Sequence, residues 1–486
     1  MTNMKTTTLS LLAIAAAFPV TAQQPDRTAP PPLEEPPTLT LPAIQQFTLG
    51  NGLPVMLMEK HQVPVVQVTV LVGVGTANDP AERIGLASMV GDMLDEGAGD
   101  RDALALADAV DFLGARLSTG AGTSSTTASL YVAVDKLDDA LPLLADVVLR
   151  PTFPPDELER KRASRLTSLL QAFDEPRAIA SVLFARALYG EHPYGNTPLG
   201  TVASINALGV DDLRRFHADY FTANNATVIV VGDLTRDVIE SQLEQVFGGW
   251  ATGDVPATGL PTVPPVRERE VLLVDKPGAP QSEIRIGRIA APRLTDEYFA
   301  LQVLNTVLGG SFTSRLNQNL REDKGWTYGA GSSFGYRTLP GPFLASSAVQ
   351  TDVTADALQE FFKEFDAIRQ PVPAEELTRA KNYEALGFPA AFQSVRGIAR
   401  SLEEIVEYDL PRDYLNHYVD RILAVTERDV QDVARRYITP DRFAIVIVGD
   451  RETIEPGIRA LNLGRVGVLS VEDVLGEKPE GTANNE

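Results

Sequence analysis

The sequence predicts an α+β fold made of two tandem, duplicated domains, each a mainly antiparallel sheet with helices packed on one face. Three observations lead to this prediction. The chain has 486 residues, which exceeds the size at which a single hydrophobic core usually stops growing. Strand and helix patterns follow one another in the same order in both halves of the chain. Short motifs also recur between the halves at one constant offset, which favours duplication of a single domain.

The repeat is visible in the letters of the sequence. Tyr220-Phe221-Thr222 precedes an apolar run that ends in Val231-Gly232-Asp233. Tyr437-Ile438-Thr439 precedes a similar run that ends in Val448-Gly449-Asp450, and both motifs have moved by the same 217 residues. Each element could be a strand–turn–helix unit of independent origin. The identical offset makes a tandem duplication the more economical interpretation.

The first half begins with a hairpin signal, because Asn51-Gly52 stands between two β-rich runs and both residues tolerate positive φ. Apolar alternation and helical periodicity then separate strands from helices, and Gly114 follows the second helix as a candidate cap. The expected strands are Val65–Val74, Arg116–Thr119, Thr127–Val134 and Ala226–Val231, and the expected helices are Ile84–Leu94, Ala103–Leu113, a helix-rich stretch from Leu137 to Tyr220, and Arg236–Phe247.

The Pro/Gly-rich stretch Thr252–Val266 predicts a linker between the halves. Beyond it the expected strands are Val271–Val274, Glu283–Ile289, Tyr328–Phe334, Phe343–Val349 and Phe443–Val448, with helices between them as far as Tyr437. The predicted organisation is a signal peptide (1–22), a Pro-rich tether (23–42), an N-terminal domain (43–250), a linker (251–268), a C-terminal domain (269–464) and a tail (465–486).

The first residues have the pattern of a secretory signal. Lys5 supplies positive charge, Leu9–Phe18 is almost wholly apolar, and Val20-Thr21-Ala22 offers small residues at a cleavage site. We therefore expect cleavage near Ala22 and a periplasmic protein; the alternative is a buried N-terminal helix. No segment reaches the ~20 apolar residues that a membrane helix needs, so no membrane span is predicted.

Composition excludes several classes of function. The net charge of −22 disfavours nucleic acid and anionic membrane surfaces, both of which require a basic footprint. The chain has no cysteine, so disulfides and thiolate metal sites are excluded. Its four histidines are too far apart in sequence to form a ligand pair on one helix face. Spacing alone therefore indicates a soluble two-lobed protein and no chemistry.

One helix nevertheless resembles a known motif. Gly85–Leu94 is similar to the helix that carries H-x-x-E-H in the pitrilysin/insulinase zinc peptidases. Further motifs of that family appear in order over Phe47–Gly464: His192-Pro193-Tyr194-Gly195 with Pro198-Leu199-Gly200, Asn224-Asn225-Ala226, Leu308-Gly309-Gly310, Ser314-Arg315-Leu316, Leu320-Arg321-Glu322 and Gly325-Trp326-Thr327-Tyr328. The resemblance implies half of a clamshell, in which full-length members use four such domains and this chain has two.

The resemblance also shows what is missing. The positions of the two histidine ligands fall on Ser88 and Asp92, that of the general-base glutamate on Gly91, and that of the third ligand, a glutamate, on Ser168. Two hydroxyls and one carboxylate do not hold zinc tightly. We therefore expect no metal and no cofactor in this chain. The nearby acidic residues Asp79, Asp92, Asp95, Glu96 and Asp100 fit no calcium loop and are expected to form a solvated helix end.

The resemblance implies two other features, and the sequence adds a third candidate residue. Arg321 and Tyr328 have the spacing of the family's Arg/Tyr pair, which contacts substrate near the scissile carbonyl; the alternative is a surface Arg and a packing Tyr. Ser118-Thr119 replaces the family's Asn-Ala on the edge strand that receives substrate. Trp326 is a candidate for the substrate path or, equally, a buried anchor.

Small bacterial members of this family include heterodimers that divide these parts between two chains. The resemblance therefore implies a peptidase subunit that is inactive alone and supplies Arg321 and Tyr328. Its partner would be a homologous two-domain subunit with intact H-x-x-E-H and zinc, and the substrate a peptide. The rival hypothesis is a catalytically inert scaffold or peptide-binding homologue, which the loss of Asn-Ala favours.

Overall fold

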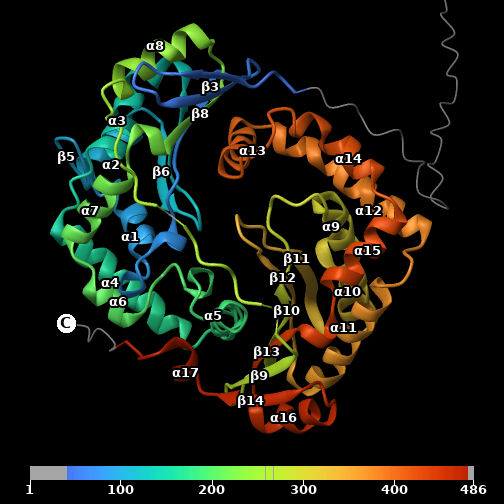
Figure 1. Cartoon of the computed structure of the whole chain (residues 1–486). Coiled ribbons are helices and arrows are strands. Elements are labelled where there is room, and N and C mark those ends of the chain that lie inside the picture. Colours follow the sequence, from blue (N-terminus) through green and yellow to red (C-terminus); the bar gives the residue numbers. More distant parts are fainter. Residues whose placement is uncertain (1–40, 258, 266, 480–486) are drawn as a thin grey trace, which may run out of the picture. The chain divides into compact units, whose positions relative to one another are not determined.

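Two six-stranded sheets organise the chain in the computed structural model (Figure 1), which describes residues 41–257, 259–265 and 267–479. The predicted signal peptide and nearly all of the predicted tether lie outside these residues. The described residues all belong to one compact unit. No helix among them is long and apolar enough to cross a membrane.

The sheet of the N-terminal domain has the strand order β1-β2-β8-β3-β7-β6. Within the described part of this sheet, β2 and β8 pair in parallel, and the other neighbouring strands are antiparallel. Among the described residues, β6 has a neighbouring strand on one side only, so its other backbone edge is free of strand pairing there. The strands are β1 (Gln45–Thr48), β2 (Pro54–Glu59), β3 (Val65–Val72), β6 (Arg116–Ala121), β7 (Thr126–Ala133) and β8 (Ala226–Gly232).

The sheet of the C-terminal domain has the order β11-β12-β10-β13-β9-β14. Read from the opposite edge, β9-β13-β10-β12-β11 repeats the order β2-β8-β3-β7-β6 of the first sheet. The edge strand β11 is the counterpart of β6. The copies differ at the far edge, where β1 pairs antiparallel with β2 but β14 pairs parallel with β9. The strands are β9 (Glu270–Asp275), β10 (Gln281–Ile289), β11 (Thr327–Phe334), β12 (Pro342–Gln350), β13 (Ala444–Gly449) and β14 (Arg465–Leu469). Both sheets are mainly antiparallel, and the predicted fold class is confirmed.

Each sheet buries one face under helices of its own domain. On β2 the side chains of Val55 and Leu57 enter the N-terminal core, which the helices of that domain complete. The helices named below are α1 (Leu86–Met93), α2 (Ala103–Phe112), α3 (Leu137–Leu149), α4 (Pro155–Ala172), α8 (Arg236–Phe247), α9 (Tyr298–Asn305), α11 (Thr354–Ile368), α12 (Ala374–Gly387), α15 (Glu427–Tyr437) and α16 (Arg451–Ala460). Two further helices behave differently.

Helices α5 (Pro176–Tyr189) and α13 (Val395–Glu407) pack on the sheet of the other domain. Helix α13 contacts β3 and β8, and α5 contacts β10 and β13. The alternate residues Met56 and Met58 of β2 accordingly join the C-terminal core rather than their own. The parallel strands β2 and β8 are thus buried on both faces, which explains their nearly unbroken apolar sequences. The exchange of helices was not predicted from the sequence.

Candidate active-site position

The site begins at the N-terminus of α1, the helix that aligns with the zinc-binding motif. Gly85 precedes the helix with φ of 92°, a left-handed conformation that glycine adopts without strain. The buried carboxylate of Asp79 accepts hydrogen bonds from the backbone N–H groups of Gly85 (2.7 Å) and Ala87 (2.8 Å). Burial raises the pKa of Asp79 to about 6, and these two N–H groups and the charge of Arg165 oppose the rise. Asp79 therefore caps the helix.

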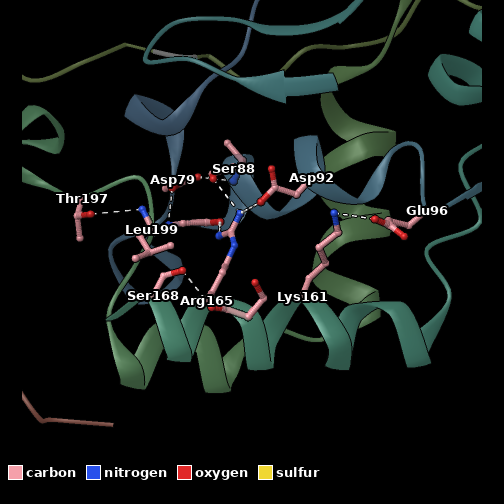
Figure 2. A network of polar contacts seen from close by, with 12 residues as sticks. Asp79, Ser88, Asp92, Glu96, Lys161, Arg165, Ser168, Thr197 and Leu199 are labelled. Carbon is pink, nitrogen blue, oxygen red and sulfur yellow. Dashed lines mark hydrogen bonds and ion pairs between the residues drawn. The ribbon is translucent and has the colours of Figure 1, made fainter. Parts of the chain in front are cut away.

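A guanidinium lies between α1 and α4, at the point where a metal would be expected (Figure 2). One nitrogen of Arg165, Nη2, donates to Ser88 Oγ at 2.8 Å and to Asp92 Oδ2 at 2.6 Å. The other, Nη1, donates to the carbonyl of Gly85 at 3.1 Å. The Arg165 side chain is 6% exposed. A single nitrogen of Arg165 thus contacts both residues that stand at the histidine positions. The positive charge between α1 and α4 is therefore a guanidinium rather than a metal ion.

Ser168 does not join Ser88 and Asp92. It is exposed on α4, and its hydroxyl donates to the carbonyl of Ser164 at 3.1 Å. The prediction placed the third ligand position at Ser168, but the residue that faces α1 is Arg165, one turn earlier. One signal in the sequence could have found it: Arg165 lies at helical spacing with the buried Leu158 and Leu169, on the apolar face of α4.

Gly91, at the position of the general base, has no room for a side chain, because the backbone of β6 packs against it. A Cβ on Gly91 would lie 2.8 Å from the nitrogen of Ala121 and 2.9–3.0 Å from the carbonyl carbon and Cα of Gly120. Real Cβ atoms almost never approach backbone below 3.0 Å. The last residues of β6 therefore rest directly on α1, and a glutamate at this position requires the edge strand to move.

The acidic residues near α1 do not form the solvated helix end that was expected. Glu96 pairs with both Arg160 and Lys161 at 2.6 Å. Burial favours a higher pKa of Glu96, but the hydrogen bonds from these two side chains outweigh it and lower the pKa. Burial raises the pKa of Asp95, which Lys161 partly opposes. Within the described residues, no group of three or more His, Asp or Glu side chains is placed to hold a metal ion.

Zinc does not fit this donor set. It requires deprotonated nitrogen, sulfur or carboxylate ligands, whereas Ser88 offers a hydroxyl and Asp92 a carboxylate that is already paired with a guanidinium. A metal at this point would also meet the positive charge of Arg165. The two helices are held together by charge-assisted hydrogen bonds in its place.

Restoring the motif by Ser88→His, Gly91→Glu and Asp92→His is expected to yield a protein with no tightly bound zinc and no peptidase activity. Arg165 would remain at the metal position, and the side chain introduced in place of Gly91 would collide with β6. Elemental analysis after exhaustive dialysis, together with hydrolysis of a casein digest, measures both properties. The control is the same triple variant with Arg165→Glu added, which tests whether the guanidinium alone blocks the metal. Stoichiometric zinc in the triple variant would contradict the prediction.

The two residues predicted on the substrate-receiving strand lie on an edge strand of the N-terminal sheet. Ser118 and Thr119 are in the middle of the edge strand β6, opposite Ser129 and Ala128 of β7. Side chains alternate along a strand, so Ser118 and Thr119 project to opposite faces of the sheet. Their free backbone edge is available for an added strand.

Arg321 and Tyr328 lie on neighbouring elements at the edge of the C-terminal sheet. Arg321 is in a π-helical turn (Gln318–Asp323), and Tyr328 is the second residue of β11. The Tyr328 side chain is 90% exposed. The Arg321 guanidinium lies 4.7 Å from the ring centre of Phe312, and Glu322 is its ion-pair partner at 3.3 Å. The π-turn and the edge strand thus carry the two groups on adjoining parts of the same sheet edge.

Trp326 is partly buried and packs against the C-terminal core, which favours its role as an anchor for the start of β11. Its backbone carbonyl accepts a hydrogen bond from the N–H of Gln350 at 3.1 Å. The ammonium of Lys324 lies 5.2 Å from its ring centre, within range of a cation–π interaction. Trp326 therefore supports the start of β11, where Tyr328 lies.

Comparisons with known proteins find the same peptidase family in both halves of the chain. The family model described as "Insulinase (Peptidase family M16)" matches residues 54–202, and that described as "Peptidase M16 inactive domain" matches residues 207–384. A Bacillus subtilis protein named as an uncharacterized zinc protease is 29% identical over 59% of this chain and 68% of its own length. A Helicobacter pylori protein named as a non-peptidase homolog is 21% identical over 82% of this chain and 92% of its own.

A solved structure also matches. The peptidase M16 inactive domain from Pseudomonas fluorescens has a TM-score of 0.79 and 28% identity, and the match covers 84% of this chain and 98% of that one. The two family models lie one after the other along the chain and include strands of both sheets. The chain belongs to the insulinase family of peptidases, M16.

Proposed function

We propose that this chain is the non-metal-binding subunit of a heterodimeric zinc metallopeptidase that degrades peptides in the periplasm. It is inactive alone. It supplies Arg321 and Tyr328 to an active site whose zinc and general base come from a homologous two-domain partner with intact H-x-x-E-H. The secretory pattern of the first 22 residues supports the periplasmic location.

One observation carries the proposal: the nitrogen of Arg165 that bridges Ser88 and Asp92 occupies the place where a metal would lie. Together with the closed position at Gly91, it supports an N-terminal domain that cannot perform zinc chemistry. The C-terminal domain differs, because the Tyr328 side chain is exposed at the edge of its sheet. A partner subunit that carries the metal would thus receive hydrogen-bond donors for the substrate from this chain.

The chemistry of these donors suits peptide hydrolysis. Attack of water on a peptide carbonyl places negative charge on the carbonyl oxygen. The hydroxyl of Tyr328 and the guanidinium of Arg321 are hydrogen-bond donors that stabilise such an oxyanion when water is excluded. The ring of Phe312 holds the guanidinium in place without competing for its N–H groups.

The test is reconstitution with a homologue from the same genome that carries H-x-x-E-H. We expect cleavage of a casein-derived peptide mixture only when both chains are present, and zinc in the partner alone. Size-exclusion chromatography with elemental analysis of each separated subunit measures assembly and metal content. Full activity of the partner without this chain would contradict the proposal.

The second candidate function is a peptide-binding scaffold without a catalytic role. It is favoured by the free edge strand β6, whose Ser118 and Thr119 depart from the Asn-Ala of active members. A scaffold would assemble and bind peptides, but its Arg321 and Tyr328 could be replaced without effect on turnover. The two candidates therefore differ in one measurable quantity, the kcat of the assembled pair.

A further inference from the structure

A cavity of about 680 Å³ follows the free edge of β6 and reaches α13. On one face of the sheet its floor is built from rows of polar side chains across three strands. Arg116 of β6 lies opposite Tyr131 of β7, which lies opposite Gln67 of β3. The next row consists of Ser118, Ser129 and Thr69, with a hydrogen bond of 3.0 Å between the last two hydroxyls. The exchanged helix α13 forms the wall.

Three guanidiniums line this floor and wall. Arg396 and Arg400 are one turn apart on α13, and Arg116 lines the cavity from the edge strand. Arg396 lies over the ring of Tyr131, 4.6 Å from its centre. Among the described residues, none of these three guanidiniums forms an ion pair with a carboxylate, and none donates a side-chain hydrogen bond. Their N–H donors thus remain available, in a chain whose net charge is −22.

A buried polar group at the same floor also lacks a partner. Gln67 is 6% exposed and lines the cavity. Its Nε2 donates to Thr69 at 3.3 Å, but its Oε1 has no hydrogen-bond partner in the described part of the molecule. Leaving a buried carbonyl oxygen unpaired costs free energy, so this floor has hydrogen-bonding capacity that the described residues do not use. Glu403 also lines this face; burial raises its pKa, which Thr69 and Arg400 partly oppose.

The other side of β6 has the opposite chemistry. There the cavity is lined by Asp95, Asp111 and the apolar side chains of Leu106, Val110 and Leu117. An extended peptide that pairs with the free edge would project alternate side chains to these two faces. The face with three arginines favours carboxylates, and the other face favours apolar or basic groups.

We propose that this cavity selects peptides with acidic side chains at alternate positions, whose carboxylates are bound by Arg116, Arg396 and Arg400. The inference names the substrate class of the peptidase subunit proposed above and rests on that proposal. Binding can nevertheless be measured on this chain without its partner. Three guanidiniums give charge-assisted hydrogen bonds, which are stronger than neutral ones but weakened here by exposure to water.

The experiment measures binding of fluorescein-labelled peptides of about ten residues, long enough to span an edge strand, to the full chain by fluorescence anisotropy. The probes are alternating Glu-Thr, Gln-Thr and Lys-Thr sequences. We expect Glu-Thr to bind about tenfold more tightly than Gln-Thr at low salt, with the preference declining as salt is added. Lys-Thr should bind no better than Gln-Thr.

Replacing Arg396→Gln and Arg400→Gln together is expected to remove the preference for Glu-Thr, and Arg116→Gln alone to reduce it. The matched control is Arg379→Gln with Arg435→Gln, which removes the same charge from exposed positions outside the cavity. Circular dichroism checks that each variant is folded. The proposal is overturned if Glu-Thr and Gln-Thr bind to wild type within about twofold of each other, or if the control pair loses as much affinity as the cavity pair. Neither result depends on turnover, so failure here is distinguishable from failure of the proposed peptidase role.

Discussion

Replacing Tyr328 with phenylalanine is expected to lower the kcat of the reconstituted heterodimer by about 10²–10³, with a much smaller change in KM. The substitution removes one hydroxyl and keeps the ring. Since the Tyr328 side chain is 90% exposed, loss of its hydroxyl should leave the fold of this chain intact. An interaction made only in the transition state affects kcat rather than the binding of substrate. Steady-state cleavage at equal zinc occupancy measures both constants.

The neighbouring guanidinium supplies a second arm of the same experiment. Arg321→Lys keeps the positive charge but loses the planar fork and the stacking on Phe312. A loss in kcat comparable to that of Tyr328→Phe would show that the geometry of the donor matters as well as its charge. Phe312→Ala leaves Arg321 unchanged and removes the ring beneath it, so a partial loss of kcat with unchanged zinc content is expected from this positioning residue.

Tyr383→Phe is the matched control, since Tyr383 is another exposed tyrosine of the C-terminal domain, on α12. It should have no effect on kcat or KM. If Tyr328→Phe retains a kcat within about twofold of wild type, the scaffold hypothesis is the better one. The heterodimer and its zinc content should be unchanged in every variant, because the metal belongs to the partner.

The fold was predictable because its signals are local and repeated. The alternating strands and the Asn51-Gly52 hairpin are present in the structure, and the 217-residue offset relates corresponding strands of the two sheets. The exchange of α5 and α13 was not predictable in the same way. The apolar runs of β2 and β8 indicate burial on both faces, but a sequence does not say which distant helix covers the second face.

The candidate site was predictable only as far as the loss of ligands. Ser88, Gly91 and Asp92 follow from alignment of one helix, whereas Arg165 comes from a second helix that contacts the first only in the folded chain. Counting along the sequence reached Ser168, which is exposed on α4, because a count of residues does not say which side of α4 faces α1. The closure at Gly91 depends on where the backbone of Gly120 and Ala121 lies, which no pattern of side chains encodes.

Because Arg165 carries the contact between α1 and α4, Arg165→Met is expected to destabilise the N-terminal domain by about 2–3 kcal/mol, less than a fully buried pair would lose. Removing one partner of such a pair costs about 3–5 kcal/mol. The loss is smaller here, since the Asp92 side chain is 44% exposed and can be hydrated. Asp79 is buried and cannot be hydrated in this way, and it would lose the positive charge of Arg165 that opposes the rise of its pKa. The carbonyl of Gly85 and the hydroxyl of Ser88 also lose their donors.

Urea unfolding followed by Trp250 fluorescence measures this effect. The chain has two tryptophans, and only Trp250 lies in the N-terminal core, so a Trp326→Phe background isolates that domain. Arg160→Met is the matched control on the same helix. Its side chain is 57% exposed in pairs with Glu96 and Glu157, and surface pairs contribute about 0–1 kcal/mol. Adding Asp92→Asn to Arg165→Met should recover part of the loss, because the uncompensated carboxylate is removed. An Arg165→Met protein no less stable than the Arg160→Met control would mean that the guanidinium fills the metal position without holding the two helices together.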